Sequence, residues 1–281
     1  MPPVDTQRIY HTLANGPYDL GVDIGRLRPQ FHLHWFETLS STNTQLWQMA
    51  AAGATSGTVV IAQTQSTGKG QWGRCWQSKA GGLYLSLLLE PDWPVQSASQ
   101  LTLCSAWGIA IAFNALDIPV KIKWPNDLVV QGQKLGGILT ETKIDADKVT
   151  QAVIGIGINW QNPVPTTGIT LNQILEKSPN KAITCLEDLT AIVLKGLWQG
   201  ICHRQQVGAA AFMKNYQTLL MHLGQFVSLE GHTGNVVGVS ASGQLQVQLH
   251  SDHTSEVAQL ISLQPGEISL GYNSLELDSS V

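Results

Sequence analysis

The chain of 281 residues has few cysteines and few charged residues, and each scarcity narrows the possible classes of protein. Its four cysteines stand far apart, at Cys75, Cys104, Cys185 and Cys202, without a Cys-x-x-Cys pair. This spacing argues against a zinc site and a disulfide framework, so we predict a reducing, cytoplasmic location. Only 13% of the residues are charged, and the net charge is -4. A non-specific nucleic-acid binder would carry a basic excess instead.

Long apolar runs are missing as well. The N-terminus lacks the basic-then-apolar pattern of a signal peptide, and no run approaches the roughly 18 apolar residues that cross a bilayer. We therefore expect no membrane association. Hydrophobic residues nevertheless make up 43% of the chain, which is enough for a main domain and a small second one.

The pattern of apolar residues divides the chain into an N-terminal arm, a region of predicted strands and helices, and a C-terminal region of short strands. Residues 1–30 combine prolines and glycines with little periodicity, which predicts an irregular arm. Apolar patterns then predict strands at 31–36, 58–62, 83–89, 120–124, 127–131, 134–143 and 151–159, and helices at 42–52, 99–116 and on both sides of Gly208 within 186–220. Thr42 and Gln45 have the spacing of a capping box at the first helix. Short strands at 226–229, 234–239, 243–249 and 255–257, with glycine turns, predict a small antiparallel barrel.

A glycine-rich, cationic loop from Gln65 to Trp76 joins two of the predicted strands. Its Gly68 to Gly73 segment matches G-x-G-x-x-G, but a dinucleotide fold needs a helix immediately afterwards, and residues 74–82 lack helical periodicity. A Walker loop fails too, because Lys69 is followed by Gly70 instead of Ser or Thr. The loop by itself fits either a cationic flap over an anion or a surface turn with solvated charges.

The second informative stretch is a predicted hairpin with a lysine at its turn. Lys123-Trp124-Pro125-Asn126-Asp127 places a rigid X-Pro bend at a strand end, which is expected to aim Asn126 and Asp127 away from the sheet. Lys134 follows the turn, beside Gly136 and Gly137. Such glycines let a ligand approach the backbone, with the ammonium above it.

Five motifs together resemble the biotin protein ligase family. They are Ser41-Thr42-Asn43, the loop from Gln65 to Trp76, K-W-P-N-D at 123–127, K-L-G-G-I-L at 134–139 and G-I-G-I-N at 155–159. The resemblance implies an α+β fold with a mixed, largely antiparallel sheet flanked by helices, like that of class II aminoacyl-tRNA synthetases, and an SH3-like barrel after it. The implied domains are the arm at 1–30, a catalytic domain at 31–222 and the barrel at 223–281.

The family's reaction is a two-step acyl transfer. Biotin and ATP, with Mg²⁺, give biotinyl-5'-AMP and pyrophosphate, and a lysine of the biotin carboxyl carrier protein of acetyl-CoA carboxylase then takes the biotinyl group. Lys134 matches the catalytic lysine, whose fixed charge would offset the repulsion between two reacting anions. The resemblance assigns biotin binding to Ser41, Thr42, Asn43, Gln65, Gly68, Lys69, Gly70, Gln71, Lys134, Gly137 and Gly155. It assigns the nucleotide to Lys69, Arg74, Trp76, Asn126, Asp127, Lys134 and Asn159, with Asp127 as a metal ligand.

The sequence also departs from the family's pattern. The usual G-R-G-R-x-G-R-x-W has Lys69 and Gln71 in place of its first two arginines. The loss of charge at Gln71 predicts weaker retention of the adenylate, because charge-assisted hydrogen bonds are the stronger ones. Many bacterial members carry a DNA-binding winged helix before the catalytic domain, and residues 1–30 have no recognition-helix pattern, so we expect no repressor role.

Two alternatives to a biotin ligase stay open. One is a lipoate or octanoate ligase or transferase of the related fold, although an apolar acyl tail would not need so many polar groups. The other is a non-catalytic biotin sensor, since Gln71 removes a charge from the site. Homodimerisation through a sheet edge is possible in such a fold, and the sequence does not identify that edge.

Overall fold

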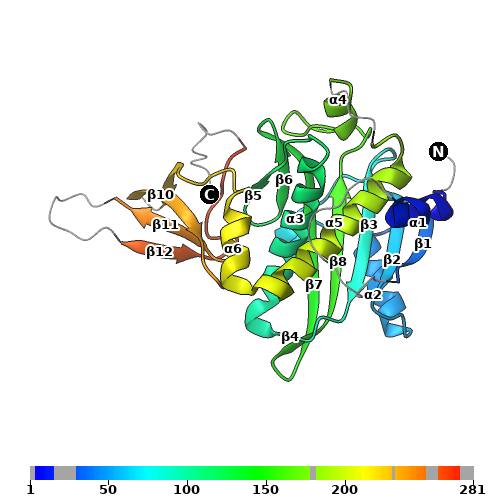
Figure 1. Ribbon diagram of the computed structural model, residues 1–281, viewed down its shortest axis with the longest axis horizontal. Helices are drawn as coiled ribbons and strands as arrows, with labels where there is room; N and C mark the ends of the chain where they lie inside the picture. The colour runs from blue at the N-terminus through cyan, green and yellow to red at the C-terminus, as the bar shows by residue number, and fades with distance from the viewer. Residues whose placement is uncertain (1–3, 16–29, 178–181, 230–231, 251–258, 273–281) are drawn as a thin grey trace.

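The protein contains a large mixed sheet, which forms its main body, and a smaller antiparallel sheet beside it (Figure 1). The computed structural model describes residues 4–15, 30–177, 182–229, 232–250 and 259–272. The large sheet consists of β1 (His32–Leu39), β2 (Thr58–Gln65), β3 (Leu83–Leu89), β4 (Trp93–Pro94), β5 (Lys121–Lys123), β6 (Asp127–Val130), β7 (Gln133–Asp145) and β8 (Lys148–Ile158). Its strand order is β1-β2-β3-β8-β7-β6-β5, and β4 pairs with β8.

Strand directions confirm the predicted α+β class and exclude a dinucleotide fold. Only β1 and β2 run parallel, whereas every other neighbouring pair in this sheet is antiparallel. The glycine-rich loop joins the antiparallel neighbours β2 and β3, with only the short 3-10 turn η1 (Gln71–Gly73) inside it. No crossover helix follows the loop, as residues 74–82 had indicated.

Helices cover both faces of the large sheet. The helices α3 (Ala98–Asn114) and α5 (Leu186–Val207) pack together on one face, where Gly108, Gly196 and Gly200 bring their backbones into close contact. The shorter α2 (Thr42–Ala51) lies on the other face, over β2, β3 and β8. Its Leu46 and Ala50 form a separate apolar cluster there, which leaves the beginning of α2 at the polar part of that face.

Two local predictions about helices are wrong. Residues Thr6–Asn15 form the helix α1 instead of an irregular arm, because Ile9 is fully buried and Arg8 pairs with Asp188 of α5 at 3.2 Å. Burial of one isoleucine contributes about 1.5–3 kcal/mol, and Val4 and Leu13 also pack against the same core. The capping box at Thr42 does not form, since Ser41 is the N-cap residue and makes no side-chain cap bond.

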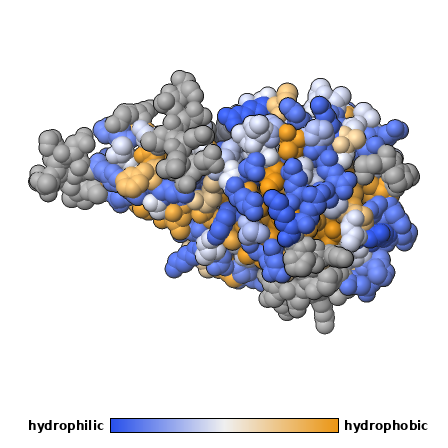
Figure 2. Space-filling model, turned by 90° about the horizontal axis from the view of Figure 1, so that it is seen from above, coloured by the Kyte–Doolittle hydropathy of each residue, from blue (hydrophilic) through white to orange (hydrophobic). Residues whose placement is uncertain are grey.

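The smaller sheet has the order β12-β11-β10-β9 and projects as a lobe from the main body (Figure 2). It consists of β9 (Phe226–Leu229), β10 (His232–Val239), β11 (Leu245–Leu249) and β12 (Leu260–Leu263), and α6 (Ala209–Gln217) precedes it. The sequence did not predict β12, and the strand predicted at 255–257 lies outside the described residues. The barrel and the domain boundary at 222/223 stay predictions. Searched for membrane spans, the described residues contain no helix both long and apolar enough to cross a bilayer.

Side chains at the junction of the two sheets tie them together. Trp124 Nε1 donates to the carbonyl of Gly243 at 3.0 Å, and Gln100 Nε2 donates to the carbonyl of Ala241 at 2.9 Å. His222 is 4% exposed, and its Nε2 lies 3.0 Å from the carbonyl oxygen of Gly271. Burial lowers the pKa of His222 to about 4. The hydrogen bond to Gly271 raises this pKa, whereas the charge of Lys123 lowers it. The junction therefore contains a histidine that is neutral at physiological pH.

Candidate functional site

A cavity of about 560 Å³ opens on the face of the large sheet that carries α2. The glycine-rich loop, the start of α2, the β6–β7 hairpin, β8 and residues 265–270 line it. The predicted site residues that line the cavity are Ser41, Thr42, Asn43, Gln65, Lys69, Gly70, Gln71, Arg74, Trp76, Asn126, Asp127, Lys134, Gly137 and Gly155. Of the predicted residues, all of which are described, Gly68 and Asn159 lie outside this lining.

One end of the cavity is built from hydroxyl and amide groups. The Gln65 Oε1 accepts from the backbone N–H of Thr42 at 2.7 Å and from its hydroxyl at 3.2 Å. The Nε2 of Gln65 donates to Ser78 Oγ at 2.7 Å, which fixes the orientation of the amide. Ser41 and Thr42 are 2% and 4% exposed, so these groups hold their positions in a nearly dry site. Here α2 begins beside the end of β2, and this junction presents both donors and acceptors.

Asn43 extends the polar end across the sheet. The hydroxyl of Ser86 on β3 lies 2.6 Å from Asn43 Oδ1, and Asn43 Nδ2 donates to Glu141 Oε2 at 2.9 Å. A Cβ at Gly155 would overlap Asn43 Oδ1, so only glycine at this point of β8 leaves room for the amide. The sequence signal for this arrangement was the glycine in the middle of an otherwise apolar strand.

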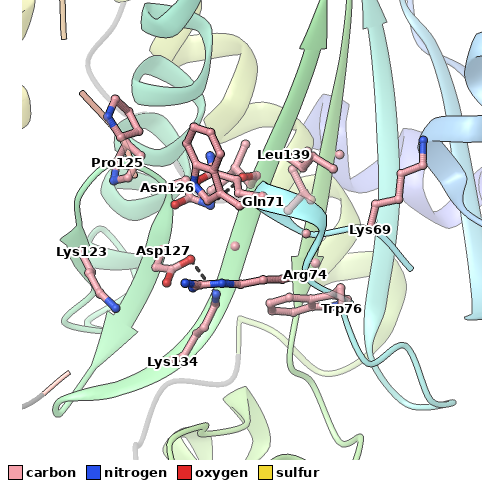
Figure 3. Close-up of a pocket in the computed structure, with 18 of the residues that line it drawn as sticks. Lys69, Gln71, Arg74, Trp76, Lys123, Pro125, Asn126, Asp127, Lys134 and Leu139 are labelled. Atoms are coloured by element: carbon pink, nitrogen blue, oxygen red, sulfur yellow. Dashed lines mark hydrogen bonds and ion pairs between the residues drawn. The ribbon is translucent and has the colours of Figure 1, made fainter. Parts of the chain in front are cut away.

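Lys69 points away from Arg74, the other cation of the loop (Figure 3). Its Nζ pairs with Glu141 Oε1 at 3.3 Å, and the same carboxylate accepts from Asn43 and from Trp47 Nε1. The lysine and glutamate side chains are 43% and 31% exposed, so this ion pair contributes at most about 1 kcal/mol. Glu141, which the motifs did not include, thus connects the loop to α2.

The opposite end of the cavity carries the ion pair of the β6–β7 hairpin. Lys134 Nζ lies 2.7 Å from Asp127 Oδ1, and the two side chains are 27% and 11% exposed. The hydroxyl of Tyr272 donates to the second oxygen, Oδ2, at 2.6 Å. Burial raises the pKa of Tyr272, and the Asp127 charge adds to this, while Arg74 opposes it. Tyr272 is therefore a protonated donor, and Asp127 holds two partners at once.

Trp76 lies flat on a floor of glycines between the two ends. Gly137 of β7 and Gly157 of β8 are register partners, and both face the indole ring. A Cβ at Gly157 would come within 2.5 Å of ring atoms of Trp76. Lys134 Nζ stands 5.1 Å from the ring centroid, within cation–π range. An aromatic plane beside a fixed ammonium is a suitable surface for a nucleobase or another flat ligand.

The glycine-rich loop folds as two paired legs. Gln65 and Ser78 form a bridge, as do Lys69 and Cys75, and Gly70 N–H donates to the Arg74 carbonyl at 2.7 Å. Only glycine fits at position 68, where the two legs of the loop approach each other, because a Cβ there would lie 2.5 Å from the Trp76 carbonyl oxygen. The N–H of Gly70 is therefore used inside the loop.

Three of the predicted polar residues have partners within the protein. Asp127 does not point away from the sheet, since it begins β6 and faces Lys134. Asn126 Nδ2 donates to the Ile138 carbonyl at 2.8 Å, which holds the turn to β7. Asn159 donates to the Lys134 carbonyl at 3.1 Å and accepts from Asn162 at 3.1 Å. It therefore supports the backbone of Lys134 from outside the cavity.

Asp127 does not fit the predicted role of a metal ligand. Both of its oxygens have partners, namely the Lys134 ammonium and the Tyr272 hydroxyl. The described residues contain no group of three or more His, Cys, Asp or Glu side chains placed to hold a metal ion. We assign no reaction step to a metal held by these residues.

The segment at 265–270 is the part of the cavity that the sequence did not reveal. It follows β12 of the small sheet and reaches the mouth of the cavity, where Gly266 meets the exposed Trp72 of the glycine-rich loop. The contact joins residues almost two hundred positions apart, so no local pattern could indicate it. Two separate parts of the chain thus close over the sheet face.

Part of the chain is similar in sequence to known proteins. Residues 35–159 match the model of the Biotin/lipoate A/B protein ligase family. The chain is 42% identical over 130 residues to the bifunctional ligase/repressor BirA of Bacillus subtilis, covering 46% of this chain and 40% of that protein. It is 34% identical over 122 residues to the biotin--[acetyl-CoA-carboxylase] ligase of Paracoccus denitrificans, covering 42% of this chain and 50% of the relative. The chain thus spans about half or less of these relatives' lengths.

A solved structure matches over a larger part of the chain. The biotin protein ligase from Aquifex aeolicus, in complex with biotin and ATP, superimposes with a TM-score of 0.64 at 28% sequence identity. The match covers 85% of this chain and 97% of that one. The structural likeness therefore extends well beyond the segment that matches the family model.

Proposed function

We propose that this protein activates biotin with ATP and transfers it to a protein lysine, since residues 35–159 match the model of the Biotin/lipoate A/B protein ligase family. The observation that carries the proposal is a single cavity with an amide and hydroxyl end and a lysine end. The bicyclic head of biotin has a ureido group that needs donors and acceptors, and its side chain ends in a carboxylate that needs a cation. These needs match the two ends of the cavity.

Gln65, Thr42 and Asn43 are the proposed partners of the ureido group. The bond between Thr42 and Gln65, and the bonds of Asn43 to Glu141 and Ser86, fix which atoms are donors and which are acceptors before a ligand arrives. Preorganised polar groups of this kind lower the entropy lost on binding. Hydrogen bonds within the protein use one N–H of the Gln65 amide and one of the Asn43 amide. An acyl chain without a polar head, such as octanoate, would bury the second N–H of each amide without a partner, at a cost of about 1–3 kcal/mol for each group. This arrangement supports biotin over an apolar acid.

Lys134 is the proposed catalytic residue. In the first step, a carboxylate oxygen of biotin attacks the α-phosphorus of ATP, the bond to the β-phosphate oxygen breaks, and pyrophosphate leaves with the electron pair. A fixed ammonium between the carboxylate and the phosphate lowers their repulsion and stabilises the charge that develops in the transition state. In the second step, a neutral lysine amine of the acceptor attacks the acyl carbon and AMP leaves.

The loop residues have proposed roles in retaining the intermediate. Trp76 offers a flat surface for adenine. Arg74 provides a cation that faces the lysine end, and Gln71 provides a neutral hydrogen-bonding group. Magnesium would arrive with ATP as part of the substrate. The name of the Paracoccus relative supports a carrier domain of acetyl-CoA carboxylase as the acceptor.

Isotope exchange between pyrophosphate and ATP tests the proposal, because exchange requires a reversible adenylation. We expect exchange with biotin, and exchange at least about 100-fold weaker with lipoate or octanoate, since two unpartnered polar groups cost roughly 3 kcal/mol. Equal exchange with lipoate would instead identify a lipoate ligase. Absence of exchange with every acid, while biotin still binds in calorimetry, would identify a sensor.

A further inference from the structure

Tyr272 connects the end of the described chain to the lysine end of the cavity. It follows the segment at 265–270, two residues after the last cavity-lining position. Its hydroxyl donates to Asp127 Oδ2 at 2.6 Å, and its ring lies beneath Lys123 Nζ, which is 3.8 Å from the ring centroid. None of the five family motifs contains this residue.

The Asp127 carboxylate needs two donors because it is only 8% exposed. Lys134 supplies one donor to Oδ1 at 2.7 Å, and Tyr272 supplies the other to Oδ2. A buried carboxylate oxygen without a donor carries a large desolvation cost. If the tyrosine hydroxyl were absent, Oδ2 would draw on the cations around it, and the Lys134 ammonium is the one that already contacts this carboxylate.

A lysine ammonium has only three N–H donors. One of them goes to Asp127, so two remain, and adenylation brings two anions, a carboxylate and an α-phosphate. A second donor drawn to Asp127 would leave one substrate anion without its partner in the transition state. The number of donors that Asp127 takes from Lys134 therefore controls what Lys134 can offer to substrates.

We propose that Tyr272 is a positioning residue that satisfies Asp127 Oδ2 and thereby reserves two donors of Lys134 for the reacting anions. This inference rests on the proposed function. It implies that the segment after the small sheet contributes to catalysis at the lysine end of the cavity. Tyr272 touches no reacting atom in this account, and it acts through Asp127 alone.

The first test replaces Tyr272 by phenylalanine, which removes the hydroxyl and keeps the ring under Lys123. The turnover number for biotin-dependent pyrophosphate exchange should fall about tenfold at a temperature where the melting curve shows the variant to be folded. The matched control is Tyr10→Phe, because Tyr10 also donates a hydroxyl hydrogen bond, to the Phe31 carbonyl at 2.7 Å, but on the α1 side of the protein. Tyr10→Phe should leave exchange within twofold of the wild type, roughly the scatter of a side chain remote from the site.

A double-mutant cycle separates this role from general structural support. In an Asp127→Asn background, Tyr272→Phe should change exchange by less than about twofold, since the carboxylate through which Tyr272 acts is gone. If Tyr272→Phe still lowers exchange tenfold in that background, the positioning role through Asp127 is refuted.

The second test needs no substrate and so does not depend on the proposed function. The rate at which acetic anhydride labels Lys134 at pH 8 can be followed by peptide mass spectrometry in the intact protein. Tyr272→Phe should slow the labelling of Lys134 by at least about threefold, because Asp127 then holds its ammonium with both oxygens. Labelling of Lys123 should stay unchanged, since its aromatic partner remains.

Equal or faster labelling of Lys134 in Tyr272→Phe would overturn the inference. If the wild type shows no biotin-dependent exchange but Lys134 labelling slows as expected, the proposed function fails while the positioning role stands. The two failures are thus distinguishable.

Discussion

Replacement of Gly157 by alanine should damage the site more than the same change at its register partner, Gly137. An added Cβ at Gly157 would lie 2.5 Å from Cε2 and Nε1 of Trp76, whereas a Cβ at Gly137 would lie 3.4 Å from the ring. Ordinary contact begins near 3.4 Å, so Gly157→Ala forces the indole to move by about 1 Å, and Gly137→Ala requires almost no shift of the ring.

The expected magnitudes follow from this displacement. Overpacking of this size costs about 1–3 kcal/mol of unfolding free energy. A misplacement of about 1 Å near reacting groups can lower a rate about 100-fold. Gly157→Ala should therefore lower kcat/KM for ATP in pyrophosphate exchange by about 100-fold, and Gly137→Ala by less than about tenfold.

Steady-state exchange at varied ATP concentration, with denaturant unfolding of both variants, measures these effects. In a Trp76→Leu background the additional loss caused by Gly157→Ala should shrink, because the rigid ring that the Cβ meets is gone. Equal losses in Gly157→Ala and Gly137→Ala would refute the idea that Trp76 is held on the glycine floor in its working position.

Two further predictions concern the loop and the junction of the sheets. Gln71→Arg should slow the release of biotinyl-adenylate, measured after rapid gel filtration, by about tenfold, because a charge-assisted hydrogen bond is stronger than a neutral one by roughly 1–1.5 kcal/mol; equal release rates would contradict this. Unfolded histidine binds a proton near pH 6.5, but folded His222 does so only near pH 4. The unfolded state thus holds more protons between these values, so lowering the pH from about 6.5 to 4 should reduce the free energy of unfolding by roughly 3 kcal/mol. His222→Gln should remove this part of the pH dependence in urea titrations, and an unchanged acid slope would count against the buried neutral histidine.

The sequence predicted best those elements whose pattern is local. The apolar run from Leu83 to Leu89 is β3, buried along its whole length, and Gly208 separates α5 from α6 with a φ of 79°. In both cases one property of the neighbouring residues decides the structure: continuous burial for the strand, and a left-handed backbone position for the break. The hairpin turn at Gln131 and Gly132, with φ of 52° and 74°, belongs to the same class.

Predictions failed where distant contacts decide the structure. The helix α1 depends on Ile9 and Arg8 meeting α5, and the two legs of the glycine-rich loop depend on Gly68 passing close to Trp76. Tyr272 reaches Asp127 across 145 positions of sequence. No periodicity records such contacts, so the motifs located most of the cavity lining but missed the segment that closes it.

The central claim is that Lys134 provides the fixed charge for adenylation, and its most direct test is a single turnover. Enzyme in excess over ATP, mixed with biotin and quenched at intervals, gives the rate of biotinyl-adenylate formation. At saturating biotin, which Thr42, Asn43 and Gln65 still bind, loss of a preorganised cation should lower this rate in Lys134→Met by about 100- to 1,000-fold. Formation of biotinyl-adenylate by Lys134→Met at a rate within twofold of the wild type would contradict the account.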